Sequence, residues 1–178
     1  MEGTNTELVF RDDLTGFYNR RYLNKQEQEL QSIRKSRVPY TLVMIDIDNF
    51  KDINDTYGHV RGDETIRDFS EFLKRALRQG DSIVRYGGDE FLFLMFNTEK
   101  HDAEMVCSRL LKRCCKRTFA GLDVSVSAGI ASFPNDGEAF KTVLKNADKA
   151  LYEAKRKGKN RIGTLKGGKI VIPSRIFV

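Results

Sequence analysis

Two apolar segments separated by a pair of glycines constrain the fold of this chain most strongly. Residues 83–86 and 91–96 both have the composition of strands, and Gly87-Gly88 between them can adopt the positive φ that a tight hairpin needs. A hairpin places its two strands antiparallel in one sheet. The chain must therefore contain an antiparallel strand pair, which argues against a doubly wound parallel sheet.

Apolar spacing along the rest of the chain alternates between the helical and the strand period. Residues 42–47 form a near-continuous apolar run typical of a central buried strand, and residues 124–130 alternate as a half-buried strand does. Helical spacing occurs in four segments, residues 19–36, 66–77, 103–114 and 140–154. The order α, β, α, ββ, α, β, α predicts an α/β fold with a mostly antiparallel central sheet flanked by helices.

The 178 residues fit a single domain, and no apolar run approaches the ~20 residues that a membrane helix requires. No secretory signal is visible at the start, so we expect a cytoplasmic protein without membrane contact. Cys107, Cys114 and Cys115 fall in one predicted helix with no His at zinc-ligand spacing, and we expect reduced thiols.

The net charge of +6 suits an anionic ligand without identifying it. Residues 155–169 contain seven Lys or Arg and no acid. Composition leaves three interpretations open for this basic segment: a nucleic-acid patch, a solvated surface or a triphosphate clamp.

Carboxylates stand at two places where strands are predicted to end or begin. Asp46 and Asp48 lie at the end of the buried strand, and Asp89 and Glu90 follow the hairpin glycines. If the hairpin neighbours the buried strand, Asp46, Asp89 and Glu90 converge on one point. Crowded carboxylates repel one another unless a divalent cation lies among them, and oxygen ligands suit Mg²⁺. Each piece alone is usually turn chemistry, but the combination favours a metal site.

Other metal and phosphate motifs fail on inspection. Residues 46–51 begin like an EF-hand loop, but Lys51 stands where the sharp turn needs Gly. Residues 163–169 match the start of a P-loop, but Ile170 replaces the Ser or Thr that binds Mg²⁺. His59 and His101 are isolated in the sequence and give no support to a His-based triad or a zinc site.

Residues 85–91, Arg-Tyr-Gly-Gly-Asp-Glu-Phe, resemble the signature of the GGDEF family of diguanylate cyclases. Residues 13–21, 46–63 and 147–155 resemble further motifs of that family, in the same order. The resemblance covers roughly residues 12–164, which leaves residues 1–11 as a leader or linker stub and residues 165–178 as a C-terminal tail, possibly the stub of a longer protein. It implies a five-stranded sheet wrapped by helices, related to the palm of nucleotide cyclases and polymerases.

The resemblance implies that the protein condenses two GTP molecules into cyclic di-GMP and two pyrophosphates. The 3′-hydroxyl of one GTP attacks the α-phosphate of the other with help from Mg²⁺ or Mn²⁺. One domain has room for one GTP, so two domains must face each other in a homodimer. Family members normally carry a sensory or receiver domain, which we expect in a longer protein. Nucleic acid is not an expected partner.

The resemblance also implies which residues hold the metal and carry the chemistry. Asp46, the backbone carbonyl of Ile47, Asp89 and Glu90 would hold the cation. Asp89 stands where the family has its proton acceptor, and Lys51 completes the expected catalytic group of Asp89, Glu90 and Lys51.

The expected substrate contacts fall into two groups, also implied by the resemblance. Asn54 and Asp63 would bind guanine, with His59 beside the substrate; an ionised carboxylate accepts from both the N1 and N2 donors of that base. The remaining contacts go to the phosphates, from the backbone amides around Asn49 and Phe50 and from Lys51, Lys155 and Lys159. Lys159 stands where the family usually has Arg, so we expect a weaker hold on the triphosphate tail.

The segment Arg78-Gln79-Gly80-Asp81 has the Arg-x-x-Asp form of the family's product-inhibition site, and Arg109 would assist it. The alternative interpretation is a helix C-terminus, in which Arg78 favours the helix dipole and Gly80 is the cap.

Three rival functions remain open at the sequence level. The first is a catalytically silent module that binds GTP or cyclic di-GMP as a receptor. The second is a related cyclase with a mixed GMP–AMP product, which Asp63 argues against. The third is a nucleic-acid-binding domain, which rests on the basic segment alone.

Overall fold

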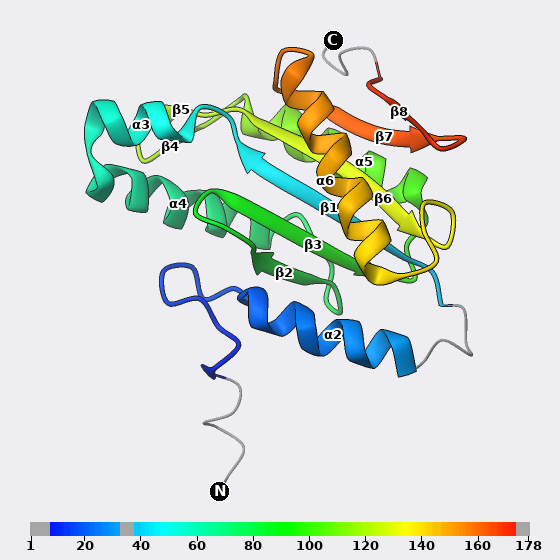
Figure 1. The fold of residues 1–178 in the computed structure, drawn as a ribbon. Helices are drawn as coiled ribbons and strands as arrows, with labels where there is room; N and C mark the ends of the chain where they lie inside the picture. The colour runs from blue at the N-terminus through cyan, green and yellow to red at the C-terminus, as the bar shows by residue number, and fades with distance from the viewer. Residues whose placement is uncertain (1–7, 33–37, 174–178) are drawn as a thin grey trace, which may run out of the picture.

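The computed structural model describes residues 8–32 and 38–173. A six-stranded sheet runs through the molecule in the order β2-β3-β1-β6-β7-β8, with a separate two-stranded sheet of β4 and β5 (Figure 1). The strands are β1 (Tyr40–Ile47), β2 (Ser82–Arg85), β3 (Glu90–Phe96), β4 (Thr118–Phe119), β5 (Leu122–Asp123), β6 (Val126–Phe133), β7 (Ile162–Lys166) and β8 (Lys169–Val171). The helices are α2 (Arg20–Ser32), α3 (Phe50–Tyr57), α4 (His59–Lys74), α5 (Lys100–Cys114) and α6 (Phe140–Arg156).

The main sheet is antiparallel except for the parallel pair of β6 and β7. The predicted α/β class with a mostly antiparallel sheet is confirmed, and the hairpin of β2 and β3 lies where the two glycines indicated. The expected number of five strands is wrong, because the sheet has six. A hairpin at Gly167-Gly168, both with positive φ, adds β8 to the sheet. Residues 165–171, which we expected in a C-terminal tail, thus form the end of β7 and the whole of β8.

The sheet is covered on both faces, which explains why β1 is apolar along nearly its whole length. Leu42 and Met44 pack in the same cluster as residues of α2 and α6, whereas Val43 and Ile45 pack with residues of α4 and α5. Figure 1 shows α6 lying across the sheet with α5 behind it. The end of β1 is consequently surrounded by elements on both sides, and Asp46 and Asp48 there are buried.

Helix α6 lies unusually close to the sheet because two strand residues have no side chain. A Cβ built on Gly129 of β6 would lie 2.1 Å from the carbonyl oxygen of Ala147, and one on Gly163 of β7 would lie 2.1 Å from that of Ala150. Backbone therefore packs against backbone, and the helix axis is fixed relative to the strands. This contact determines where the C-terminal turn of α6, with Lys155, stands above the end of β1.

Two elements differ from the expected helices. The helix expected over residues 19–36 is α2, and residues 33–36 of it lie outside the described residues. Helix α3 was not expected, and it has no buried residue to give it an apolar period.

No helix in the described ranges is long and apolar enough to cross a membrane.

Cys107 lies in the middle of α5, Cys114 is its last residue and Cys115 follows it. All are free, and Cys107 and Cys114 are buried whereas Cys115 is exposed. Burial raises the pKa of the Cys107 thiol and raises that of Cys114 to about 12, so both stay protonated at neutral pH.

Candidate active site

Three carboxylates converge where β1 ends beside the start of β3. Antiparallel pairing of these strands places Asp46 directly opposite Glu90. The backbone N–H of Ile47 donates to the carbonyl oxygen of Asp89 at 3.3 Å, which holds the hairpin tip against the end of β1. The hairpin therefore neighbours the buried strand, as the convergence of Asp46, Asp89 and Glu90 requires.

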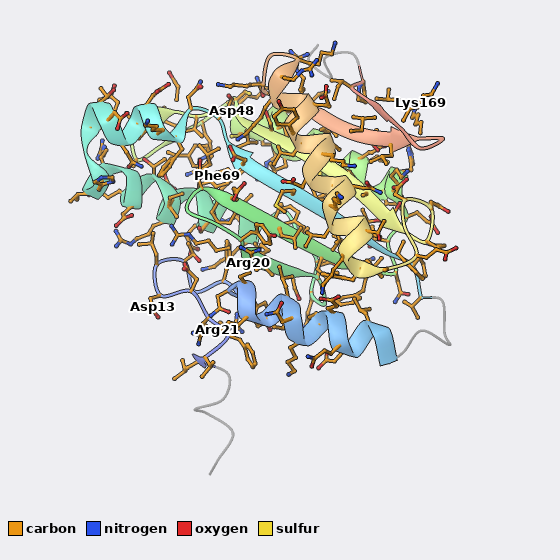
Figure 2. The ribbon with its side chains drawn as sticks, in the orientation of Figure 1. Asp13, Arg20, Arg21, Asp48, Phe69 and Lys169 are labelled. Atoms are coloured by element: carbon orange, nitrogen blue, oxygen red, sulfur yellow. The ribbon has the colours of Figure 1, made fainter. Side chains whose placement is uncertain are left out.

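The three acids form one electrostatic unit. Burial, with further repulsion from Asp89 and Glu90, raises the pKa of Asp46 to about 6, against the lowering effect of Lys155. Burial and the Asp89 carboxylate raise the pKa of Glu90 as well, and Arg20 at the start of α2 lowers it. Figure 2 shows Arg20 at the end of α2 that lies beneath β3. The negative charge gathered here favours a cation.

In the structure a lysine supplies that positive charge. Nζ of Lys155 lies 2.6 Å from Oδ1 of Asp46, whose side chain is 6% exposed. Across the described part of the chain, no three His, Cys, Asp or Glu side chains are arranged to hold a metal ion as they stand. The chemistry of the donor set nevertheless fits Mg²⁺, because Asp46, Asp89, Glu90 and the carbonyl of Ile47 offer only hard oxygen ligands. A metal ion and Lys155 would compete for the same carboxylate.

The hairpin tip is shaped by its glycines and by an arginine. A Cβ on Gly87 would lie 2.5 Å from Oε2 of Glu90, so the Glu90 carboxylate folds over that residue. Arg85 donates to the carbonyl oxygen of Gly88 at 2.8 Å and forms an ion pair with Asp12 at 3.2 Å. The segment before α2 is thereby tied to the turn that carries the acids.

The residues expected to bind guanine lie at the corner between α3 and α4. A Cβ on Gly62 would lie 1.9 Å from Oδ1 of Asn54 and 3.2 Å from the ring of Phe50, so both side chains pack against α4 at that glycine. Asp63 follows Gly62 directly and is exposed, and exposed His59 is the first residue of α4. The structure thus brings Asn54 next to the residue that precedes Asp63.

The expected phosphate-binding residues lie at the start of α3 with the loop before it, and at the end of α6 with the loop after it. Asn49, with φ of 60°, separates β1 from α3, and Phe50 and exposed Lys51 form the first turn of that helix. The second loop follows α6, and Nζ of its Lys159 donates to Oδ1 of Asn49. The two loops are therefore in contact.

Asp48 is a site residue whose role the sequence did not reveal. It is buried just beyond β1 and accepts hydrogen bonds from Ser125, Ser127 and the backbone N–H of Asn160. Figure 2 shows it where the chain turns from β1 toward α3. A signal was present, because Ser125 and Ser127 are the polar residues that alternate with Val124 and Val126 in the strand predicted to follow α5. Their partner became visible only when β1 and β6 were paired.

A family model described as "Diguanylate cyclase, GGDEF domain" matches residues 9–161 of the chain. The chain belongs to the GGDEF-domain family. The match spans the acids of β1 and β3, the corner between α3 and α4, and the loops before α3 and after α6.

Characterised relatives agree with that assignment. Diguanylate cyclase A of Treponema denticola is 36% identical over 137 residues, covering 75% of this chain and 37% of that protein. Response regulator PleD of Caulobacter vibrioides is 36% identical over 165 residues, covering 88% of this chain and 36% of that protein. The chain thus spans little more than a third of the length of these relatives.

Solved GGDEF-domain structures have the same fold. The coiled coil and GGDEF domain of DgcB from Caulobacter crescentus, in complex with c-di-GMP, matches with a TM-score of 0.80 and 26% identity, covering 90% of this chain and 87% of that one. Diguanylate cyclase SiaD from Pseudomonas aeruginosa, in complex with its activator SiaC, matches with a TM-score of 0.79 and 34% identity, covering 90% of this chain and 65% of that one.

The Arg-x-x-Asp segment of this GGDEF domain is engaged with its own fold. Arg78 donates to the carbonyl oxygen of Phe96 at 2.6 Å and to Oγ1 of Thr98 at 2.9 Å, and its Nε lies 3.5 Å from Oδ2 of Asp81. The Asp81 side chain is buried, and burial raises its pKa. Arg78 thereby connects the turn before β2 to the end of β3 and stabilises the position of that turn.

Arg109 lies on α5 and lines a different feature. A cavity of about 360 Å³ between α4 and α5 is bordered by apolar residues and four cations: Arg75, Arg109, Lys112 and Arg113. Neither Arg78 nor Asp81 lines that cavity.

Proposed function

We propose that this domain is a diguanylate cyclase that condenses two GTP molecules into cyclic di-GMP with release of two pyrophosphates. The observation that carries the proposal is the pairing of β1 with β3, which brings Asp46 opposite Glu90 and next to Asp89. Membership of the GGDEF-domain family and relatives named as diguanylate cyclases support the same activity.

The carboxylates define the metal part of the site. Asp46, Asp89, Glu90 and the carbonyl of Ile47 would hold Mg²⁺ or Mn²⁺. The ion would neutralise charge on the phosphates and lower the pKa of the attacking 3′-hydroxyl. Asp89, at the exposed hairpin tip, is the residue that takes the proton from that hydroxyl.

The remaining residues bind and orient GTP. Asp63 accepts from N1 and N2 of guanine, Asn54 binds the same base and His59 lies beside the substrate. The phosphates bind to the backbone amides at Asn49 and Phe50 and to three cations, Lys51, Lys155 and Lys159. Lys155, which pairs with Asp46 in the structure, would pair with phosphate in the loaded site, so its charge would be balanced in both states.

The reaction requires two copies of the domain. One set of guanine-binding and metal-binding residues serves one GTP, and each new ester bond joins the 3′-oxygen of one nucleotide to the α-phosphorus of the other. Two domains therefore face each other as a homodimer, and a longer protein with a sensory or receiver domain would control how they meet.

Feedback by the product is part of the proposal. Cyclic di-GMP would bind at Arg78 and Asp81, with Arg109 assisting from α5. Arg78 would exchange its bonds to the Phe96 carbonyl and Thr98 for phosphate or a guanine edge, and Asp81 would have to become exposed to accept from the base. Binding of the product would therefore require a movement of the turn before β2.

Incubation of the protein with GTP and Mg²⁺, followed by chromatography of the products, tests the activity. We expect cyclic di-GMP from the wild type, none after addition of EDTA, and recovery with added Mg²⁺ or Mn²⁺. Asp89→Ala should abolish the product without loss of helical circular dichroism, whereas Asp102→Ala, an exposed acid of α5, should leave turnover unchanged.

The outcomes separate the rival functions. Binding of GTP or cyclic di-GMP without turnover would identify a receptor domain, and a product that contains AMP would identify a mixed cyclase. Undiminished turnover in Asp89→Ala would remove Asp89 from the metal site.

A further inference from the structure

The Asp48 carboxylate is buried beside the site and accepts hydrogen bonds from other groups of the protein. Its Oδ1 accepts from Oγ of Ser127 at 2.7 Å, and its Oδ2 accepts from Oγ of Ser125 at 2.8 Å and from the backbone N–H of Asn160 at 2.9 Å. The three donors are neutral. They offset the loss of hydration of a carboxylate that is 5% exposed.

These bonds join three parts of the chain that are remote in sequence. Ser125 directly precedes β6, Ser127 is the second residue of that strand, and Asn160 belongs to the turn between α6 and β7. The backbone N–H of Asp48 also donates to the carbonyl oxygen of Ser125 at 2.9 Å. The carboxylate therefore fixes the turn after α6 to the end of the central strand.

The turn that Asp48 holds is a strained one. Lys159 and Asn160 have φ of 59° and 48°, a left-handed conformation that is unfavourable for residues with a side chain, more so for Lys than for Asn. A hydrogen bond from Asn160 to a charged acceptor helps to keep this conformation. Without it, the turn and the Lys159 side chain would lose their fixed position.

On its other side Asp48 is followed by Asn49, which also has a left-handed conformation, with φ of 60°. Nζ of Lys159 donates to Oδ1 of Asn49. Asp48 thus connects two loops. Its backbone belongs to the loop that contains Asn49, and its carboxylate accepts a hydrogen bond from Asn160 in the loop after α6.

We infer that Asp48 is a positioning residue for the triphosphate. It sets the separation between Lys159 on one side and the amides of Asn49 and Phe50 on the other, so that both bind the same phosphate tail. The inference rests on the proposed function of the site. It assigns Asp48 a task distinct from that of Asp46 two residues earlier, which carries the metal ion.

The test measures binding without turnover. The probe is 3′-deoxy-GTP with Mg²⁺, which lacks the attacking hydroxyl, and the reference ligand is GMP, which lacks the β- and γ-phosphates. Calorimetric dissociation constants are compared for the wild type, Asp48→Asn, Lys159→Met and the double variant. Asp48→Asn keeps the size of the side chain and two acceptor lone pairs, and urea unfolding verifies that each variant is folded.

We expect Asp48→Asn to weaken 3′-deoxy-GTP binding about tenfold and GMP binding less than twofold, because only the tail contacts are misplaced. In the Lys159→Met background, Asp48→Asn should add less than about twofold, since the residue through which it acts is already absent. Ser127→Ala leaves the bond to Asn160 in place and should change both affinities less than twofold.

Two results would overturn the inference. Equal losses for 3′-deoxy-GTP and GMP would show that Asp48 maintains the fold as a whole, and additive losses in the double variant would show that it does not act through Lys159. A wild type that binds neither nucleotide would instead refute the proposed function, so the two failures are distinguishable.

Discussion

At the scale of single residues, the site is built around the buried acid Asp46. Its carboxylate lies opposite Glu90 and close to Asp89, and Lys155 counters the repulsion. A carboxylate whose pKa is raised in the folded state opposes folding when it is ionised. The arrangement that prepares a cation site therefore lowers the stability of the metal-free protein.

Asp46→Asn should consequently raise stability while it abolishes turnover. With a folded-state pKa of about 6 against 3.8 for the free group, the gain should reach about 2–3 kcal/mol above pH 6. Well below pH 3.8 the carboxyl is protonated in both states, and the gain should vanish. Between these limits the Asp46 carboxyl ionises in the unfolded chain but not in the folded one. The free energy of unfolding of the wild type therefore falls as pH rises, and the difference in stability between variant and wild type grows. Urea unfolding of metal-free protein across this range measures the difference; a gain independent of pH would contradict the assignment.

Lys155→Gln should have opposite effects on two ligands. Without the Lys155 ammonium beside Asp46, Mn²⁺ should bind nucleotide-free protein roughly tenfold more tightly or more. The same change should weaken GTP binding, because a cation proposed to bind phosphate is lost. Electron paramagnetic resonance titration of free Mn²⁺ measures the first effect. Lys157→Gln removes an equal charge from an exposed residue two positions later and serves as the control. Equal Mn²⁺ affinities in the two variants would show that Lys155 does not compete with the metal ion.

At the scale of elements, α6 controls the site through its contact with the sheet. Gly129→Ala would place a methyl group 2.1 Å from a carbonyl oxygen and 2.2 Å from the backbone nitrogen of Leu151, and neither atom can rotate away. We expect a loss of about 1–3 kcal/mol or more in stability. Lys155 should move with the helix, so GTP binding by the folded fraction should weaken too. Gly88→Ala, where a Cβ meets nothing within 4 Å, is the control for stability; an unfolding midpoint for Gly129→Ala equal to that of Gly88→Ala would contradict the prediction.

The elements also show what the sequence could predict. β1, α5 and α6 bury a face or a whole strand, so apolar spacing revealed them. α3 buries no residue, and β8 has three residues of which none is fully buried, so neither left a periodic signal. The convergence of Asp46 with Glu90 followed from placing the hairpin beside the buried strand. The bonds from Asp48 to Ser125 and Asn160 span 77 and 112 residues, and no local pattern specifies a partner at that separation.

At the scale of the whole molecule, the proposed reaction needs two domains, and a mixed dimer tests this requirement. A large excess of Asp89→Ala added to wild type should place most wild-type subunits opposite a partner that binds GTP without activating it. One ester bond then forms and the second does not, so the linear dinucleotide should accumulate at the expense of cyclic di-GMP. An equal excess of Asp63→Ser should place most wild-type subunits opposite a variant subunit that cannot hold guanine. The yield of both products should then fall. Chromatography with mass detection distinguishes them; unchanged cyclic product under either excess would indicate that a single domain completes the reaction.

The bond between Asp48 and Asn160 also bears on how the protein is made. Synthesis proceeds from the N-terminus, and β1 with its acids emerges from the ribosome more than a hundred residues before the turn that carries Lys159 and Asn160. The two phosphate loops acquire their relative position only when that last turn closes on Asp48. If the domain acts as we propose, a nascent or prematurely terminated chain has the carboxylates of β1 and β3 but lacks Lys159, and cyclic di-GMP comes only from domains that have been translated beyond Asn160.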